Sequence, residues 1–288
     1  MELTDIKTIV VIGAGVMGRG IALVSARAGF RTVLFDINAE MLKVSESYAN
    51  KFFTKSVERG KMTEAEKEQA LANIVYTDKP EERKGELVVE AILERLDLKQ
   101  MVLKEIAAIN RPDCILASNT STIPITQIAN GIDNPGRVVG MHFFNPAPIM
   151  KLVEVISGEM TDPGVSKLVF ELAEYMGKKA VHAKDEPGFI VNRVARHFYV
   201  ESLQVLEEQV ASHEVIDGLI RNFGFRMGPF ELMDLIGIDT NLSVTKSMHA
   251  SFFYDEKFRP SRIQQKKVDA GHYGRKSGRG FYDYNQDK

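Results

Sequence analysis

Short apolar runs alternate with longer amphipathic stretches in the part of the chain before residue 185. The runs have the length and β-branched composition of buried strands, and the stretches between them have a helical period. Strands alternating with helices favour an α/β fold with a mostly parallel sheet. The predicted strands cover residues 8–12, 31–35, 74–76, 87–91, 115–117, 137–142, 151–156 and 179–182, and helices are predicted at 96–109 and 163–176.

Two polar, amphipathic stretches separate the second and third predicted strands, where a parallel crossover needs only one helix. The first runs from Asn38 to Arg59, and the second begins at Thr63, whose Thr-x-x-Glu sequence is typical of a capping box. We therefore predict a helical hairpin inserted near residues 38–73. Surplus elements in such folds often serve a ligand.

The predicted strands 137–142 and 151–156 are joined by a short link that contains Pro146 and Pro148. Parallel neighbours need a longer crossover than this link allows. We therefore expect the two strands to pair as an antiparallel hairpin at one end of the sheet.

The pattern changes near Asp185, because every later periodic stretch has a helical period. Glycine or proline residues separate the stretches, which are typical of helices at 189–209, 212–223, 228–236 and 239–252. We predict a sheet domain at residues 1–185 and an all-helical domain at residues 186–288.

The 37 basic and 39 acidic side chains nearly balance, so no global field attracts nucleic acid or an anionic membrane. No apolar stretch approaches the length of about twenty residues that spans a bilayer, and residues 1–5 do not resemble a signal peptide. We therefore expect a cytoplasmic protein. Cys114 is the only cysteine, and its strand-like neighbours favour a buried, inert thiol. The six histidines lack metal-ligand spacing, so no metal is expected.

A G-x-G-x-x-G sequence follows the first predicted strand directly. In this motif Gly13 permits the tight turn, Gly15 lets the backbone approach a pyrophosphate, and Gly18 lets the next helix lie against the strand. Val16 and Met17 occupy the start of that helix, whose free amides attract phosphate. The sheet domain is therefore predicted to be of the Rossmann type and to bind a dinucleotide.

Asp36 follows the second predicted strand, about twenty residues after the glycines, where a carboxylate accepts both hydroxyls of an adenosine ribose. This acid favours NAD over NADP. Asn38 or Arg31 could still tolerate the 2′-phosphate of NADP, so the preference between the two cofactors stays open.

His142 ends a predicted strand at the carboxyl edge of the sheet, where open α/β folds bind their ligands. Glu154 lies on the next strand, at the same distance in sequence from Pro148, so a hairpin places the two residues opposite each other. Such a pair can act as a general base and its orienting carboxylate. The alternative is that His142 only caps the strand end and that Glu154 pairs with a lysine or arginine.

Five segments, in their order and spacing, resemble the L-3-hydroxyacyl-CoA dehydrogenase family: Ser-Asn-Thr-Ser at 118–121, Gly-Met-His-Phe-Phe-Asn-Pro at 140–146, Lys-Leu-Val-Glu-Val at 151–155, Pro-Gly-Phe-Ile-Val-Asn-Arg at 187–193 and Met-Gly-Pro-Phe-Glu-Leu at 227–232. The resemblance spans nearly the whole chain and is strongest to the free-standing bacterial 3-hydroxybutyryl-CoA dehydrogenases. It implies that the helical domain binds substrate and forms a homodimer.

The resemblance implies that His142 is the general acid/base on the C3 oxygen of the substrate and that Glu154 is its carboxylate partner. Ser121 and Asn192 would be the polar residues around that oxygen. Without the resemblance, Ser121 fits a helix N-cap before Pro124, and Asn192 fits a polar position on a helix face.

The resemblance also places Glu94, Lys99, Asn145 and Lys276 near the cofactor. The alternative for Glu94 and Lys99 is a solvated helix start with side chains of opposite charge.

The helical hairpin would grip the adenosine 3′-phosphate of coenzyme A, as the resemblance also implies. Ser47, Lys51 and Lys55 supply suitable donors about one turn apart on one helix. The alternative for these three residues is a solvated charged face.

The resemblance implies the reversible, NAD-dependent oxidation of a short-chain L-3-hydroxyacyl-CoA, with 3-hydroxybutyryl-CoA favoured, in fatty acid or butyrate metabolism. Two alternatives remain. One is a gulonate-type sugar-acid dehydrogenase on the same scaffold, and the other is a catalytically silent NAD-binding sensor.

Overall fold

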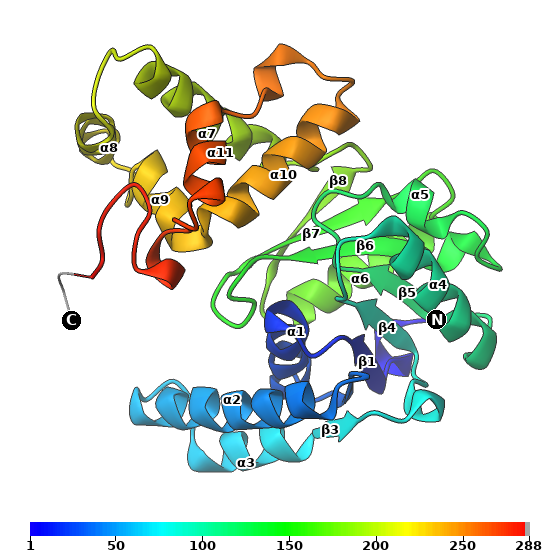
Figure 1. Ribbon diagram of the computed structural model, residues 1–288. Helices are drawn as coiled ribbons and strands as arrows, with labels where there is room; N and C mark the ends of the chain where they lie inside the picture. The colour runs from blue at the N-terminus through cyan, green and yellow to red at the C-terminus, as the bar shows by residue number, and fades with distance from the viewer. Residues whose placement is uncertain (286–288) are drawn as a thin grey trace. The chain divides into compact units, whose positions relative to one another are not determined.

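The structure, a computed structural model, describes residues 1–285. It divides into two compact units, the first comprising Met1–Phe189 and the second starting at Ile190. The first unit is built around a β-sheet, and the second is built from helices (Figure 1). No helix within residues 1–285 is long and apolar enough to cross a membrane.

An eight-stranded sheet forms the centre of the first unit, in the order β3-β2-β1-β4-β5-β6-β7-β8. The strands from β3 to β6 are parallel, whereas β7 runs antiparallel to β6 and pairs in parallel with β8. The predicted α/β fold, with a mostly parallel sheet and an antiparallel end, is confirmed. The strands are β1 Thr8–Ile12, β2 Arg31–Phe35, β3 Ile74–Thr77, β4 Leu87–Glu90, β5 Ile115–Ser118, β6 Val138–Phe143, β7 Leu152–Ser157 and β8 Lys179–Lys184.

Helices cover both faces of this sheet, and alternate residues of β1 belong to two different cores. Ile9 and Val11 belong to the core that includes residues of α1 (Val16–Arg27) and α6 (Pro163–Tyr175). Val10 and Ile12 belong to the core that includes residues of α4 (Leu96–Ile109) and α5 (Ile125–Ala129). Short 3₁₀ helices complete the unit at Leu3–Asp5, Pro80–Glu82 and Pro135–Arg137.

The predicted helical hairpin lies between β2 and β3 and consists of α2 (Ala39–Glu58) and α3 (Glu64–Ala72) (Figure 1). The capping box is present, because the Thr63 amide donates to the Glu66 carboxylate at 2.7 Å and the Glu66 amide donates to the Thr63 hydroxyl at 3.2 Å. Phe53 of α2 is buried against Leu23 of α1, which anchors the hairpin to the sheet unit.

In the second unit, residues 190–285 form five α-helices: α7 Val191–Glu207, α8 His213–Asn222, α9 Pro229–Ile236, α10 Ile238–Ser251 and α11 Arg262–Asp269. Leu203, Phe230 and Met233 lie in its core. The first four helices agree with the predicted ones to within two residues at every boundary. Helix α11 was not predicted, because its polar sequence has too few apolar residues to show a helical period. Two 3₁₀ helices lie at Glu256–Phe258 and Arg275–Ser277.

The predicted start of the first of these helices at Phe189 is wrong. Phe189 has a φ of 50°, a left-handed conformation that a helix does not contain, and its side chain is buried in the first unit. The helix begins at Val191 instead.

Two buried carboxylates organise the carboxyl-terminal segment of the second unit. Asp217 accepts hydrogen bonds from the amides of Phe230 and Glu231, both at 3.0 Å. It thereby supplies acceptors for two amides in the first turn of α9 that have no partner within the helix. Asp234 accepts hydrogen bonds from the amides of Phe281 and Tyr282, both at 2.9 Å. These bonds hold the segment that follows α11 against α9.

Candidate active site

The glycine loop between β1 and α1 is tightly constrained at two of its three glycines. Gly13 has a φ of 99°, and a Cβ there would lie 2.8 Å from the carbonyl oxygen of Ala91. A Cβ on Gly18 would overlap the carbonyl oxygen of Gly13. Both positions therefore require glycine for the fold itself, because the residue after β4 lies against Gly13 and the glycine loop lies against Gly18 in the first turn of α1.

Gly15 differs from the other two glycines, because a Cβ at this position would meet no atom of the protein within 4 Å. Gly15 lines a cavity of about 680 Å³ together with Gly13, Val16, Met17 and Asp36. The free amides at the start of α1 face a space that a side chain at Gly15 would fill, and this arrangement suits a pyrophosphate. The residues present therefore fit a bound dinucleotide.

Asp36 follows β2 at the edge of this cavity. One carboxylate oxygen accepts a hydrogen bond from the amide of Ala14 at 2.7 Å, and the other accepts one from the amide of Asn38 at 2.8 Å. These bonds fix the carboxylate between the glycine loop and the start of α2. Arg31 begins β2, about 16 Å from Asp36 along the extended strand, so the idea that it could accommodate a 2′-phosphate beside Asp36 is wrong.

Arg83, which the sequence analysis missed, lines the same cavity. Its guanidinium lies 4.9 Å from the centre of the Phe35 ring and 3.4 Å from the carboxylate of Glu105. No motif marks this arginine, because chain segments distant in sequence bring it to the cavity.

His142 and Glu154 are directly opposite each other in the β6–β7 hairpin, as predicted. The Nδ1 atom of His142 lies 2.7 Å from Oε2 of Glu154, and both side chains are buried, with 5 % and 0 % exposure. The rings of Phe144 and Phe189 lie 4.5 and 5.9 Å from the imidazole, between ring centres. A buried imidazole bonded to a carboxylate has the geometry of a general base with its orienting partner.

A buried ion network lies at the carboxyl ends of β4 and β5. The Nζ atom of Lys99 is 2.7 Å from Glu90 and 3.2 Å from Glu94, and only 1 % of the Lys99 side chain is exposed. The other oxygen of Glu90 accepts a hydrogen bond from the Ser118 hydroxyl at 2.6 Å. The alternative of a solvated helix start is therefore wrong for Lys99. The sequence analysis assigned no role to Glu90 or Ser118, because each follows a simple apolar run that gives no sign of a buried ion.

Glu94 organises the loop that carries Ser121. One of its oxygens accepts hydrogen bonds from the hydroxyl of Thr120 at 2.7 Å and from the amides of Ser121 and Thr122 at 2.8 and 3.1 Å. Desolvation opposes the charged form of Glu94, but the Lys99 ammonium and these donors outweigh it and lower the pKa of Glu94. The loop is therefore held by a charged carboxylate.

Ser121 is not the N-cap of the following helix, so that alternative is wrong. The cap position of α5 is Pro124, and the Asp185 carboxylate instead accepts hydrogen bonds from the amides of Ile125 and Thr126 at 2.6 and 2.7 Å. Asp185 lies 60 residues further along the chain than Ile125, so no local sequence pattern predicts this cap.

The other candidates are distributed over both units. In the first unit, Asn145 is exposed in the link between β6 and β7. In the second unit, Asn192 lies in the first turn of α7, and the Lys276 ammonium lies 2.6 Å from the carboxylate of Asp239.

Ser47, Lys51 and Lys55 are all exposed and lie one turn apart on α2. Neither lysine takes part in an ion pair with any residue that the structure describes. Two unpaired ammonium groups on one helix face leave that face free to meet an anion.

Cys114 is a free thiol with 1 % exposure. Burial raises the pKa of this thiol to about 12, so it is protonated at neutral pH. The prediction of a buried, inert cysteine is confirmed.

Two family models match this chain. The NAD-binding domain of 3-hydroxyacyl-CoA dehydrogenase matches residues 8–186, and the C-terminal domain of 3-hydroxyacyl-CoA dehydrogenase matches residues 188–284. The chain belongs to the 3-hydroxyacyl-CoA dehydrogenase family. The resemblance found in the sequence is thereby confirmed, together with NAD as the cofactor and the class of NAD-dependent 3-hydroxyacyl-CoA dehydrogenase.

Individual relatives agree with this family. The 3-hydroxyadipyl-CoA dehydrogenase of Escherichia coli (strain K12) is 45% identical over 99% of this chain, which spans 61% of the length of that relative. The probable 3-hydroxybutyryl-CoA dehydrogenase of Bacillus subtilis (strain 168) is 43% identical over 98% of this chain and 99% of its own length. The crystal structure of (S)-3-hydroxybutyryl-CoA dehydrogenase from Ralstonia eutropha is similar with a TM-score of 0.93, at 39% identity over 97% of this chain and 99% of that chain.

Proposed function

We propose that this member of the 3-hydroxyacyl-CoA dehydrogenase family reversibly interconverts 3-hydroxybutyryl-CoA and acetoacetyl-CoA. Relatives from Bacillus subtilis and Ralstonia eutropha that align over 99% of their own length are named for 3-hydroxybutyryl-CoA, which supports a short acyl chain. The observation that carries the proposal is the buried hydrogen bond between His142 and Glu154, at 2.7 Å.

The proposed chemistry assigns each nitrogen of His142 a task. A carboxylate can only accept a hydrogen bond, so Nδ1 carries the proton toward Glu154 and Nε2 has a free lone pair. In the oxidation direction Nε2 takes the proton of the substrate hydroxyl, and Glu154 stabilises the imidazolium that forms. NAD, when bound, supplies the acceptor for the hydride from C3. In the reduction direction His142 returns the proton to the C3 oxygen.

Ser121 and Asn192 are proposed to bind the C3 oxygen of the substrate. The hydrogen bond from the Ser121 amide to Glu94 supports this role for Ser121, because it orders the loop around the serine. Glu94, Lys99, Asn145 and Lys276 are proposed to contact the cofactor. Gly13, Gly15, Val16, Met17 and Gly18 are proposed to surround its pyrophosphate, with Asp36 at the adenosine ribose.

The loss of NADH absorbance on adding acetoacetyl-CoA to the purified protein tests this function. We expect rapid oxidation of NADH with acetoacetyl-CoA and none with acetoacetate, which lacks coenzyme A. Longer 3-ketoacyl-CoA esters measured in parallel test the chain length. No turnover with any thioester, in a protein that binds NADH, would contradict the proposal.

Replacing Asp36 with alanine is expected to weaken NADH binding by at least about tenfold and to affect NADPH much less. The reason is that the variant loses the ribose acceptor and frees two backbone amides. Fluorescence titration with both nucleotides measures the two dissociation constants. Asp78→Ala, which removes an exposed acid after the neighbouring strand β3, is the matched control. If the ratio of the two dissociation constants were unchanged, residues other than Asp36 would discriminate between NADH and NADPH.

The α2 face is proposed to grip the adenosine 3′-phosphate of coenzyme A through Ser47, Lys51 and Lys55. Replacing both lysines with alanine is expected to raise the KM for acetoacetyl-CoA by about tenfold, equivalent to about 1.4 kcal/mol. Lys43→Ala on the same helix is the control, because Lys43 is paired with Glu40 at 2.7 Å. The wild type should turn over a sugar acid such as gulonate poorly. If the double variant lost the same factor in activity with acetoacetyl-CoA and with the sugar acid, the two lysines would not bind the phosphate of coenzyme A.

A homodimer is proposed to form through the helical unit. Val215 and Leu219 of α8 and Phe223, which caps its end, follow one another at four-residue intervals, and the three residues are 53 %, 56 % and 83 % exposed. A second copy of the chain can cover this apolar stripe, because a twofold axis brings identical patches together. Phe223→Glu is expected to convert dimers to monomers in sedimentation equilibrium, whereas Phe253→Glu, also exposed, leaves them intact. A monomeric wild type would refute the dimer.

A further inference from the structure

The β6–β7 link, residues 144–151, joins the two strands that carry His142 and Glu154. It also carries Asn145, which is exposed, and Phe144, whose ring lies 4.5 Å from the His142 imidazole between ring centres. The position of this link therefore affects the proposed proton carrier and one proposed cofactor contact. A segment outside regular structure has many possible conformations, so side chains elsewhere must fix this one.

The link packs directly on α1, the helix whose first turn faces the proposed pyrophosphate site. The contact lies at Gly20, which is buried in α1 one turn after Val16. A Cβ on Gly20 would lie 3.1 Å from Cβ of Ala147 and 3.2 Å from Cδ of Pro148, which is closer than ordinary van der Waals contact. The absence of a side chain at Gly20 therefore lets the link approach the cofactor helix closely.

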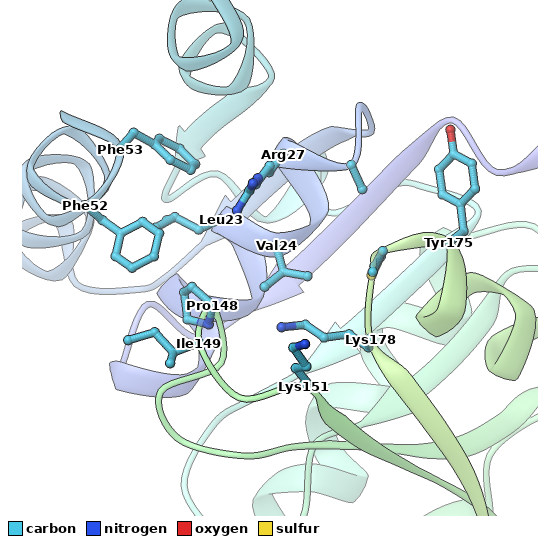
Figure 2. Close-up of a pocket in the computed structure, with 13 residues that line it drawn as sticks. Leu23, Val24, Arg27, Phe52, Phe53, Pro148, Ile149, Lys151, Tyr175 and Lys178 are labelled. Carbon is cyan, nitrogen blue, oxygen red and sulfur yellow. The ribbon is translucent and has the colours of Figure 1, made fainter. Parts of the chain in front are cut away.

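Lys178 holds the same link through two hydrogen bonds to its main chain. The ammonium donates to the carbonyl oxygens of Ala147 at 2.6 Å and Met150 at 2.9 Å. Lys178 lies in the turn between α6 and β8, and Figure 2 shows its side chain extending toward the link beside Pro148. The two acceptors are three residues apart, so the bonds fix the curvature of the link and not only a single atom.

Lys178 is a buried cation that has no acidic partner among residues 1–285. It is 8 % exposed and lines a cationic cavity of about 390 Å³ together with Arg27 and Lys151. Burial and the nearby charge of Arg27 lower the pKa of Lys178 to about 8. A buried charge without a counter-ion destabilises a fold, which indicates that this lysine serves the link and not overall stability.

We propose that Gly20 and Lys178 are positioning residues that set the place of His142 relative to α1, the helix proposed to hold the cofactor. Gly20 lets the link pack against this helix, and Lys178 keeps the link folded there. The cofactor and His142 must reach the same substrate at once, and a misplacement of about 1 Å can slow such a reaction by about 10²-fold. This assignment rests on the proposed function, because it concerns the reaction proposed for His142.

Lys178→Met tests the hydrogen bonds, because it removes the donors and keeps most of the side-chain volume. We expect the single-turnover rate of NADH oxidation, measured by stopped flow at saturating acetoacetyl-CoA, to fall by about tenfold or more. The Kd for NADH should change by less than about twofold. Lys151→Met, which removes an exposed lysine from the same cavity, is the matched control and should leave the rate unchanged. A raised KM for acetoacetyl-CoA with an unchanged single-turnover rate would make Lys178 a substrate contact and overturn the proposal.

Rebuilding the ammonium separates positioning from a general loss of stability. Lys178→Cys should be as slow as Lys178→Met. Alkylation of the new thiol with 2-bromoethylamine forms a carbon–sulfur bond, releases bromide and restores an ammonium at nearly the length of lysine. We expect recovery of about half or more of the wild-type rate, because the new ammonium again offers donors to the link. Wild-type protein treated in parallel is the control, since the Cys114 thiol is buried and protonated and should not react. Recovery of the melting temperature without recovery of the rate would assign Lys178 to folding alone.

Gly20→Ala tests the contact with α1. The added methyl group meets Ala147 and Pro148, so the link must move by a few tenths of an ångström. We expect the single-turnover rate to fall by about threefold. Gly218→Ala on α8 is the control, because an added Cβ there meets no atom within 4 Å. A wild-type rate in Gly20→Ala would overturn the role of Gly20.

Hydrogen exchange provides a readout that does not depend on activity. The amides of Ile149 and Met150 both donate to the carbonyl oxygen of Pro146 at 2.9 Å, so they report on the folding of the link. In Lys178→Met we expect these amides to exchange about tenfold faster and the amides of β1 to stay unchanged. Unchanged protection of the link would overturn the proposal. If the wild type reduces no thioester, the proposed function fails, and hydrogen exchange still decides whether Lys178 orders the link.

Discussion

Replacing His142 with alanine is expected to lower kcat for acetoacetyl-CoA reduction by about 10²–10⁴-fold, the usual contribution of a general acid/base. The imidazole is the proposed proton carrier, and its Nδ1 atom is already bonded to Glu154. The Kd for NADH should stay nearly constant, because the glycine loop and Asp36 follow other strands, β1 and β2. Steady-state kinetics and NADH fluorescence titration measure the two effects separately.

His182→Ala is the matched control for this variant. His182 lies on β8 of the same sheet, is exposed, and stacks on Phe170 with ring centres 4.6 Å apart. Its removal should leave kcat within about twofold of the wild type. If His142→Ala kept near-normal turnover, the proton carrier would be another group.

Replacing Lys99 with methionine is expected to lower the free energy of unfolding of the first unit by about 3–5 kcal/mol. The variant removes the cation between Glu90 and Glu94 and leaves the carboxylate of Glu90, which has 0 % exposure, buried without a counter-ion. Urea unfolding followed by far-UV circular dichroism measures the change. NADH protection against unfolding shows whether the neighbouring cofactor site survives.

Lys104→Met, an exposed change on the same helix, is the control and should cost less than about 0.5 kcal/mol. Adding Glu90→Gln to Lys99→Met should recover part of the loss, because the buried charge disappears. Equal stabilities for Lys99→Met and Lys104→Met would mean that the network contributes little to folding.

The central pair of the site could be predicted because its geometry is local. A link that is too short for a parallel crossover forces a hairpin, and the equal distances of His142 and Glu154 from Pro148 set their pairing. The glycine loop was predictable for the same reason, since Gly13 needs a positive φ within one βα turn and Gly18 lies against the carbonyl oxygen of Gly13 in that same turn.

Other parts of the site depend on residues that are far apart in the chain. Glu90 meets Ser118 across 28 residues, and Asp185 caps α5 across 60 residues. When a single acid follows an apolar strand, the sequence pattern is the same whether its carboxylate is buried or exposed. Only the packed structure shows whether a cation or a backbone amide lies beside that carboxylate.

The sequence by itself determined the order of the strands and of the helices before α11, the glycine loop and the His142–Glu154 register, because each follows from periodicity or from a short connection. The tertiary structure alone decided the burial of Lys99, the positive φ of Phe189 and the cationic cavity at Lys178. These features arise where segments separated by tens of residues pack together. Their energies depend on desolvation and on neighbouring charge, which no local pattern specifies.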